Sequence, residues 1–263
     1  MAQLDSKNVI EVSDLSLSIA DKAILKNISF NIASNEIVAM VGESGSGKSL
    51  TALSLLGLLP LAKTSINSGS IQFEKTELLN FSETQWQKIR GNEISMVFQE
   101  PQSSLNPTMR CGAQVNEIIQ QHFKTSLSKE KRKEKVLEAF DRVKLPSPER
   151  IYNAYPHEIS GGQKQRVMIA MALINKPKLL IADEPTTALD VLVQKEIIDL
   201  LKELQKQTQM SVLFISHDLS LVYQLSDKII VLKNGKVIEK GSTESIFSKP
   251  INNYTKALIN SII

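Results

Sequence analysis

The sequence predicts an α/β fold built around a parallel sheet, and two observations predict it. First, an apolar run at 36–41 precedes a glycine-rich loop at 42–49, and a helical run at 50–58 follows the loop. Second, apolar runs at 178–182 and 211–215 end in polar residues and alternate with helical patterns. Strands that alternate with helices favour a parallel sheet whose strands are joined by helical crossovers.

The segments around the glycine-rich loop predict a second, antiparallel part. Apolar and polar residues alternate over residues 8–35, which predicts a meander with one solvated face. The polar segment 63–70 predicts a turn-rich connection. A short strand is then expected at 71–73, a short helix at 82–90 and another strand at 94–98.

Residues 99–160 differ in kind and predict a helical insert. Helical spacing recurs at 115–122 and 129–143, and prolines 146, 148 and 156 are expected to mark loops. The charged run 129–135 is more typical of a solvated helix face than of a nucleic-acid patch.

After the insert the α/β pattern returns, and further elements complete the expected core. Helices are expected at 163–175, 193–207 and 219–225, and a hairpin across Asn234 and Gly235. We therefore expect a single domain over residues 1–263. Its α/β core with the antiparallel subdomain occupies 8–98 and 161–240, the helical insert 99–160 and a C-terminal tail 241–263.

Composition excludes several classes of protein. The net charge of +3 is too small to indicate a nucleic-acid partner, and the single cysteine, Cys111, excludes a disulfide framework. The N-terminus lacks the pattern of a signal peptide, and no apolar run approaches the ~20 residues of a membrane span. A soluble cytoplasmic protein is expected, with any membrane role through a partner.

The glycine-rich loop fits the phosphate-binding pattern G-x-x-x-x-G-K-[ST]. Its residues are Gly42, Glu43, Ser44, Gly45, Ser46, Gly47, Lys48 and Ser49. Glycines let backbone N–H groups turn inward toward an anion, and the following helix adds its partial positive charge. Lys48 would reach the β- and γ-phosphates, and Ser49 would hold Mg²⁺. An ordinary glycine-rich turn is the alternative, and the strand and helix on either side argue against it.

Polar residues follow three other apolar runs. Asp183 and Glu184 end one of them, so an aspartate could hold Mg²⁺ and the next carboxylate could deprotonate a water. His217 follows another run and could contact a γ-phosphate, whereas His122 and His157 are expected to be structural. Gln99 has the same placement and could approach the metal or the water. Ligands bind at the carboxyl ends of parallel strands, which favours these interpretations over surface acids and a structural histidine.

A second anion-binding device precedes the helix at 163–175. It consists of Ser160, Gly161, Gly162 and Gln163. A serine hydroxyl, two glycines and a helix N-terminus suit an anion, but the same pattern is also typical of a plain helix cap. The residues alone leave open whether this is a cap or a surface facing a nucleotide held by another subunit.

Taken in order, these motifs resemble an ABC-transporter ATPase over roughly residues 8–240. The motifs are the phosphate loop, Gln99, Ile159 to Gln163, Leu180 to Glu184, Ala188 to Asp190, and His217. The resemblance implies a P-loop NTPase (RecA-like) core and a head-to-tail dimer with two ATP molecules at its interface. It also implies that Glu184 is the catalytic base, Asp183 a magnesium ligand, His217 the switch histidine and Asp190 a cross-interface contact. Gln99 would link the nucleotide to a transmembrane partner.

A narrower resemblance is to the ATPases of dipeptide, oligopeptide and nickel importers. It is seen in Phe98 to Arg110, in Tyr155 to Gly162 and in Tyr254 to Leu258. These importers comprise two ATPase subunits, equal or different, two permeases and an external binding protein. The implied location is therefore the cytoplasmic face of the membrane, and the segment from Gln99 to Arg110 would transmit closure to the permease.

Some positions depart from that family. Ile159 replaces the usual leucine, and the aromatic that stacks on adenine would fall near Ile19 or Ala20, neither of which is aromatic. The chain has no C-terminal cysteine cluster, so no iron–sulfur centre is expected. It could also be half of a protein that elsewhere is fused in tandem.

Two other functions share these motifs. A soluble ABC ATPase of translation or DNA repair would usually show a second such domain or long coiled coils, which the sequence lacks. A regulatory copy without catalysis is disfavoured by intact Lys48, Asp183, Glu184 and His217. The cargo is not predicted, because cargo contacts belong to the permease and the binding protein.

Overall fold

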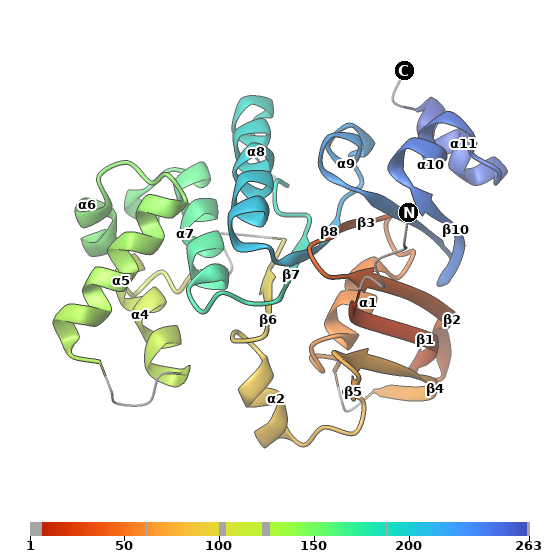
Figure 1. The fold of residues 1–263 in the computed structure, drawn as a ribbon, viewed down its shortest axis with the longest axis horizontal. Helices are drawn as coiled ribbons and strands as arrows, with labels where there is room; N and C mark the ends of the chain where they lie inside the picture. Colours follow the sequence, from red (N-terminus) through yellow and green to blue (C-terminus); the bar gives the residue numbers. More distant parts are fainter. Residues whose placement is uncertain (1–6, 61–62, 100–103, 123–126, 188, 262–263) are drawn as a thin grey trace. The chain divides into compact units, whose positions relative to one another are not determined.

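The computed structural model describes residues 7–60, 63–99, 104–122, 127–187 and 189–261. It divides into two compact units (Figure 1). Unit 1 comprises Met1–Gln87 and Gln209–Ile263, and unit 2 comprises Lys88–Thr208. The predicted limits of core, insert and tail stay a prediction. None of the helices in the described ranges is both long enough and apolar enough to cross a membrane.

An antiparallel sheet in unit 1 confirms the predicted meander. Its strands pair in the order β2 (Lys22–Ala33), β1 (Asn8–Ile19), β4 (Thr64–Phe73) and β5 (Thr76–Glu77). The prediction of a turn-rich connection over residues 63–70 is wrong, because most of this segment forms β4. Its small polar residues lie on a largely exposed stretch that pairs with β1, with Ser70 opposite Ser13. Backbone pairing therefore outweighed the turn propensity of this segment.

The parallel strands of unit 1 surround β3 (Ile37–Val41), in which every residue is buried. Strands β8 (Ser211–Ile215) and β9 (Lys228–Lys233) pair with β3 in parallel, and β10 (Lys236–Ser242) pairs with β9 in an antiparallel hairpin. Asn234 and Gly235 both have positive φ, at 49° and 73°, as a two-residue type I′ turn requires. The predicted hairpin is confirmed.

The helix after the phosphate loop is shorter than the sequence predicted. Helix α1 covers Lys48–Ser54, and the chain leaves it through Gly57 at φ 59°. The N–H of Leu58 donates to Leu53 O at 3.0 Å, which closes the helix with a left-handed cap. A Cβ at Gly57 would lie 2.4 Å from the Trp86 ring, so the chain needs glycine here.

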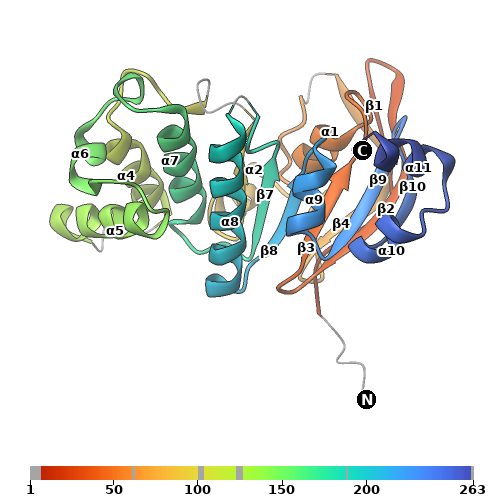
Figure 2. The ribbon, with the colours of Figure 1, turned by 90° about the horizontal axis from the view of Figure 1, so that it is seen from above.

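Of the other helices in the first and last parts of the chain, α2 (Glu83–Ile89) and α9 (Leu219–Leu225) lie close to their expected positions. Helices α10 (Thr243–Ser248) and α11 (Asn253–Asn260) form in the segment 241–263, which was expected only as a tail. The Gln85 side-chain oxygen accepts from Ser82 N at 2.9 Å, which supports the predicted start of α2. Helices α10 and α11 lie beside β9 and β10 (Figure 2).

Unit 2 contains a parallel strand pair and a group of helices, and Figure 2 shows the helices. The strands are β6 (Ile94–Val97) and β7 (Leu179–Asp183). The helical elements are α4 (Cys111–His122), α5 (Lys129–Arg142), α6 (Pro148–Asn153), the 3₁₀ turn η1 (Pro156–Glu158), α7 (Gly161–Leu173) and α8 (Val191–Thr208). Pro148 and Pro156 begin short helical segments, and the prediction of loops there is wrong because proline is well suited to a first helical position.

Apolar side chains of α4 and α5 form the centre of the helical group. Val115, Ile119, Val136 and Phe140 are all at most 1% exposed. The charged run at the start of α5 is mostly exposed, which confirms the predicted solvated face. Cys111 is buried, and burial raises the pKa of its thiol to about 11, so the cysteine packs as a small apolar residue.

Candidate functional site

The phosphate loop of unit 1 has the inward curl that its glycines were expected to allow. Gly42, Gly45 and Gly47 all have positive φ, at 150°, 77° and 110°. A Cβ at Gly42 would lie 2.2 Å from Leu232 O, and a Cβ at Gly47 would lie 2.6 Å from a Leu25 methyl group. A Cβ at Gly45 would meet nothing within 4 Å. The loop is therefore packed against its own unit on one side and open at Gly45 on the other.

Two buried polar side chains belong to this loop. Lys48 is 6% exposed, and its ammonium donates to Gly42 O at 2.7 Å and to Glu43 O at 3.0 Å. The Ser46 hydroxyl is also buried and has no hydrogen-bond partner within the described part of the chain. A buried hydroxyl without a partner costs ~1–3 kcal/mol, and an anion oxygen in the loop would remove that cost. A bound phosphate would suit both groups.

His217 lies at the same sheet edge as the phosphate loop. Met40 pairs with Ile215 in the parallel ladder, so Gly42 and His217 each follow the ladder by two residues. His217 is exposed, and the next residue, Asp218, caps α9 by accepting from Ser220 N at 2.8 Å. The expected position of His217 at a strand's carboxyl end is confirmed.

Unit 2 repeats this arrangement with Gln99 and Glu184. Val97 pairs with Ala182 in the ladder between β6 and β7, so both side chains emerge at one edge. The Gln99 amide Nε2 donates to Glu184 Oε2 at 3.1 Å. The sequence placed both residues after strands, and the structure brings them into contact.

Glu184 has a second donor and an unusual backbone. Thr187 Oγ1 donates to Glu184 Oε2 at 3.0 Å, a contact that sequence reasoning missed because no motif pointed to it. Glu184 adopts φ 46°, a left-handed conformation that is uncommon outside glycine. The preceding Asp183 is 5% exposed at the end of β7. A strained backbone and two donors together set the orientation of the Glu184 carboxylate.

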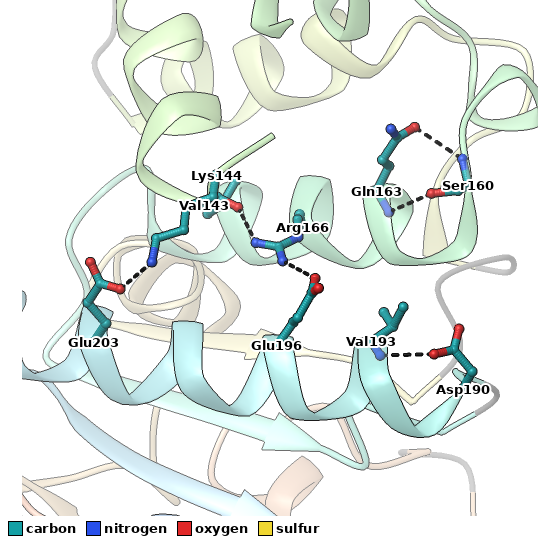
Figure 3. A network of polar contacts seen from close by, with 9 residues as sticks. All are labelled: Val143, Lys144, Ser160, Gln163, Arg166, Asp190, Val193, Glu196 and Glu203. Atoms are coloured by element: carbon teal, nitrogen blue, oxygen red, sulfur yellow. Dashed lines mark hydrogen bonds and ion pairs between the residues drawn. The ribbon is translucent and has the colours of Figure 1, made fainter. Parts of the chain in front are cut away.

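Ser160 and Gln163 form a reciprocal capping box at the N-terminus of α7 (Figure 3). The Ser160 hydroxyl accepts from Gln163 N at 3.3 Å, and Gln163 Oε1 accepts from Ser160 N at 3.2 Å. Ser160 and Gly161 are exposed. The expected cap is therefore present, and the first turn of the helix still faces outward.

Asp190 lies close to this cap, immediately before α8 (Figure 3). Its carboxylate accepts from Val193 N at 2.9 Å. A Cβ at Gly162 would lie 2.9 Å from a Val193 methyl group, so the two helix starts pack closely. Residues 100–103 and 188, which contribute to two of the motifs, lie outside the described residues.

Arg166 fastens the capped helix to its neighbours (Figure 3). Its guanidinium donates to Val143 O at 2.8 Å and to Glu196 Oε2 at 2.9 Å. Lys144 forms a further ion pair with Glu203 at 2.5 Å. The Arg166 contacts hold α7 to the end of α5 and to α8, and the Lys144 pair joins the end of α5 to α8.

The oxygen donors predicted for Mg²⁺ are the hydroxyl of Ser49, the side-chain amide of Gln99 and the carboxylate of Asp183. Ser49 is exposed in the first turn of α1, and Asp183 is buried at the end of β7. The described residues contain no group of three or more His, Cys, Asp or Glu side chains arranged to hold a metal. This donor set fits Mg²⁺, which binds through one or two protein oxygens together with phosphate oxygens and water.

The strand, the curled glycine loop with its buried lysine, and the following helix define a P-loop NTPase. Residues 25–187 match the ABC transporter family. The chain belongs to the ABC transporter family, and the resemblance seen in its motifs is confirmed.

Relatives with transport names cover most of this chain. It is 45% identical over 263 residues to the peptidoglycan transport ATP-binding protein YejF of Agrobacterium fabrum. The alignment covers 98% of this chain and 48% of that protein. The chain is 43% identical to the oligopeptide transport ATP-binding protein OppD of Bacillus subtilis, and the alignment covers 97% of this chain and 72% of that protein. It is 42% identical to the dipeptide transport ATP-binding protein DppD of Haemophilus influenzae, and the alignment covers 97% of this chain and 77% of that protein.

Solved structures of ABC cassettes share the fold. The cassette MJ0796, solved as a dimer in a post-hydrolysis state with ADP and phosphate, has a TM-score of 0.76 and 29% identity, covering 89% of this chain and 98% of that one. CbiO1 of Clostridium perfringens, part of the transporter complex cbiONQ, has a TM-score of 0.80 and 29% identity, with 97% of each chain covered. The predicted fold class is confirmed.

Proposed function

We propose that the protein is the ATP-hydrolysing, nucleotide-binding subunit of an ABC importer for peptides. The observation that supports this most directly is the phosphate loop, in which a buried lysine and an unsatisfied buried hydroxyl suit a phosphate. Relatives named for oligopeptide and dipeptide transport favour a peptide cargo. The chain supplies no cargo site of its own in this proposal, so cargo choice rests with its partners.

In the proposed site the loop from Gly42 to Ser49 binds the triphosphate of ATP. Lys48 leaves the loop carbonyl oxygens for the β- and γ-phosphates, and Ser49, Asp183 and Gln99 are the groups that would hold Mg²⁺. When bound, Mg²⁺ neutralises charge on the phosphates. The protein's contribution is then positioning and charge stabilisation in the transition state.

Glu184 is proposed as the general base for the attacking water. A base must be held within hydrogen-bond reach of the proton that it removes. The donors Gln99 and Thr187 fix one carboxylate oxygen, which orients the side chain for this task. His217, at the edge beside the phosphate loop, is proposed to contact the γ-phosphate.

The second anion device is proposed to serve a nucleotide held by another subunit. The exposed N-terminus of α7, with Ser160, Gly161, Gly162 and Gln163, would face the triphosphate of a partner, and Asp190 would contact that partner. A similar cassette was solved as a dimer, which supports pairing, and in this proposal the pair is head-to-tail with two shared ATP molecules. The pair is either two copies of this chain or this chain with a related ATPase.

The further partners follow from the family. Permease subunits would bind the ATPases at the cytoplasmic face of the membrane, and an external solute-binding protein would act indirectly. The segment from Gln99 to Arg110 is proposed to transmit closure of the dimer to the permease, although 100–103 lie outside the described residues. A chelated nickel cargo remains an alternative from the narrower resemblance. A soluble ATPase of translation or DNA repair is disfavoured by the transport names of the relatives.

Replacement of the proposed base tests the function. The purified ATPase with its co-expressed permease should hydrolyse ATP, and Glu184→Gln should abolish turnover while ATP binding remains. Because ATP then stays unhydrolysed, the variant should accumulate as a stable dimer in size-exclusion chromatography with Mg-ATP. Glu138→Gln, an exposed change on α5, is the matched control and should behave as wild type.

Two results would contradict the proposal. Unchanged turnover in Glu184→Gln would remove Glu184 from its role. Failure of the wild-type protein to bind ATP, or to co-purify with any membrane subunit, would overturn the importer function itself.

A further inference from the structure

The C-terminal helix of unit 1 is anchored by one carboxylate. Glu239 of β10 accepts from Ile251 N at 2.8 Å and from Asn252 N at 3.0 Å. The Asn252 side chain in turn accepts from Tyr254 N at 2.9 Å and caps α11. These bonds fix where α11 starts and therefore where Tyr254 lies.

Tyr254 extends from α11 to the phosphate loop. Its hydroxyl accepts a hydrogen bond from Glu43 N at 3.0 Å. The Lys233 ammonium, at the end of β9, lies 4.3 Å from the centre of the Tyr254 ring, within the range of a cation–π contact. The ring is thus held by a cation while its hydroxyl contacts the backbone of the loop.

The Glu43 backbone forms hydrogen bonds both inside and outside the loop. Inside the loop, Glu43 O accepts from Ser46 N at 3.1 Å and from Lys48 Nζ at 3.0 Å. Outside the loop, Glu43 N donates to Tyr254. If ATP draws the Lys48 ammonium away to its phosphates, the inner bond from lysine is lost and the outer bond to Tyr254 remains.

The loop depends on such outer contacts because its glycines provide little stiffness of their own. Glycine loses more conformational freedom on ordering than any other residue. A second outer contact exists at Ser46, whose carbonyl accepts from Gly235 N at 2.9 Å. The loop is therefore held from outside at Glu43 and at Ser46, and only the first of these contacts comes from a side chain.

We propose that Tyr254 is a positioning residue for the phosphate loop, holding the Glu43 backbone through its N–H in the conformation that binds ATP. This inference rests on the proposed function of the loop. The hydroxyl acts through the loop and does not itself touch the nucleotide. By ordering the loop before ATP arrives, it lowers the entropy lost on binding and so tightens binding.

The experiment removes the hydroxyl and keeps the ring. In Tyr254→Phe the contact with Lys233 is retained, but Glu43 N loses its acceptor. ATP affinity, measured by calorimetry on the purified ATPase, should fall by about threefold to tenfold, as expected for one hydrogen bond. In the complex with the permease, KM for ATP should rise by a similar factor while kcat stays within about twofold.

Tyr223→Phe is the matched control. Tyr223 is also in unit 1, is 58% exposed and has its ring against Phe247 at 4.8 Å. This variant should bind ATP as wild type does. A second variant, Lys233→Met, should show a smaller loss of ATP affinity than Tyr254→Phe, because the hydroxyl remains and only the support of the ring is removed.

The outcomes separate this inference from the proposed function. If wild type binds ATP and Tyr254→Phe binds it equally well, the positioning role is overturned, even if the variant unfolds at a lower temperature. A lower kcat at unchanged KM would also overturn it, because the hydroxyl would then act on the chemical step. A wild type that binds no ATP would overturn the proposed function before Tyr254 is tested.

Discussion

At the scale of single residues, two glycines with left-handed backbones illustrate different constraints. Gly57 ends α1 at φ 59°, and a Cβ there would lie 2.4 Å from the Trp86 ring. Gly45 has φ 77°, and a Cβ there would meet nothing within 4 Å. At Gly57 a side chain is disfavoured both by the left-handed backbone and by the lack of space. At Gly45 it is disfavoured by the left-handed backbone alone.

Alanine at the two positions should therefore cost different amounts. Gly57→Ala should lower the free energy of unfolding by about 2–4 kcal/mol, since it adds a clash to the left-handed strain. Gly45→Ala should cost about 1 kcal/mol, from strain alone. Urea unfolding of both variants without nucleotide measures the difference. Equal losses would show that Trp86 moves aside freely.

Residue types predicted much of the candidate site but not all of it. The phosphate loop, Gln99, Glu184 and His217 were recognisable because a motif or the end of an apolar run marked them. Thr187 carried no such mark, and Tyr254 was marked only as part of the tail that resembles importer ATPases, with no contact to the phosphate loop predicted for it. Their contacts depend on where a turn and a C-terminal helix return in space, and neighbouring sequence does not encode that position.

At the scale of elements, the helices of unit 2 are joined by polar contacts of unequal burial (Figure 3). The Arg166 side chain is 12% exposed and bonds both Val143 O and Glu196. The Lys144 and Glu203 side chains are 57% and 44% exposed. Solvent weakens the second pair far more than the first.

Substitutions of the two cations should reflect this difference. Arg166→Met should lower the free energy of unfolding by about 1–3 kcal/mol, because it leaves the Val143 carbonyl without this donor. Lys144→Met should cost less than about 1 kcal/mol. Chemical denaturation of the two variants provides the comparison. A larger loss in Lys144→Met would mean that the surface pair holds the helices together.

The edge of the antiparallel sheet should respond to acid through Glu77. Partial burial raises the pKa of Glu77, but the Ser70 hydroxyl and the N–H groups of Leu79 and Ile71 outweigh it and leave the pKa below 4.5. The unfolded chain then binds the proton more readily, so the stabilisation is complete above that value and is lost as pH falls below it. Glu77→Gln should flatten this loss between about pH 5 and pH 3.

Thermal unfolding across that pH range measures the effect of Glu77. Glu11→Gln, an exposed change on β1 of the same sheet, is the control and should keep the wild-type slope. An unchanged slope in Glu77→Gln would assign the acid sensitivity to other carboxylates.

Elements with strong periodicity were predictable, and those set by pairing were not. The apolar residues at 179–182 and 212–215 lie in the buried strands β7 and β8, as four successive apolar residues predict. The polar segment that became part of β4 has no apolar period, and only its partner β1 makes it a strand. The end of α1 likewise depends on Trp86, which approaches Gly57 from a later segment.

At the scale of the whole molecule, the proposed dimer places Lys48 of one copy and Ser160 of the other at each nucleotide. Lys48→Met and Ser160→Arg should each prevent ATP-dependent dimerisation when present alone. A mixture of the two variants forms pairs in which one site has both groups intact. Light scattering of the mixture with non-hydrolysable ATP should therefore show dimers that neither variant forms.

The mixing experiment has a clear contrary result. Dimers formed equally well by each variant alone would show that the site does not join groups from two copies. Lys202→Met, an exposed change on α8, serves as the control and should dimerise without mixing.

The turn between β9 and β10 has a practical consequence for protein engineering. Hairpin tips are ordinarily good places for affinity tags, fluorophores or inserted domains. Here Gly235 is buried, its carbonyl accepts from Lys26 N, and a Cβ would lie 1.8 Å from Ile24 O. Gly235 N also donates to Ser46 O at 2.9 Å, so a reporter attached at this tip would disturb the phosphate loop, and probes belong elsewhere on the surface.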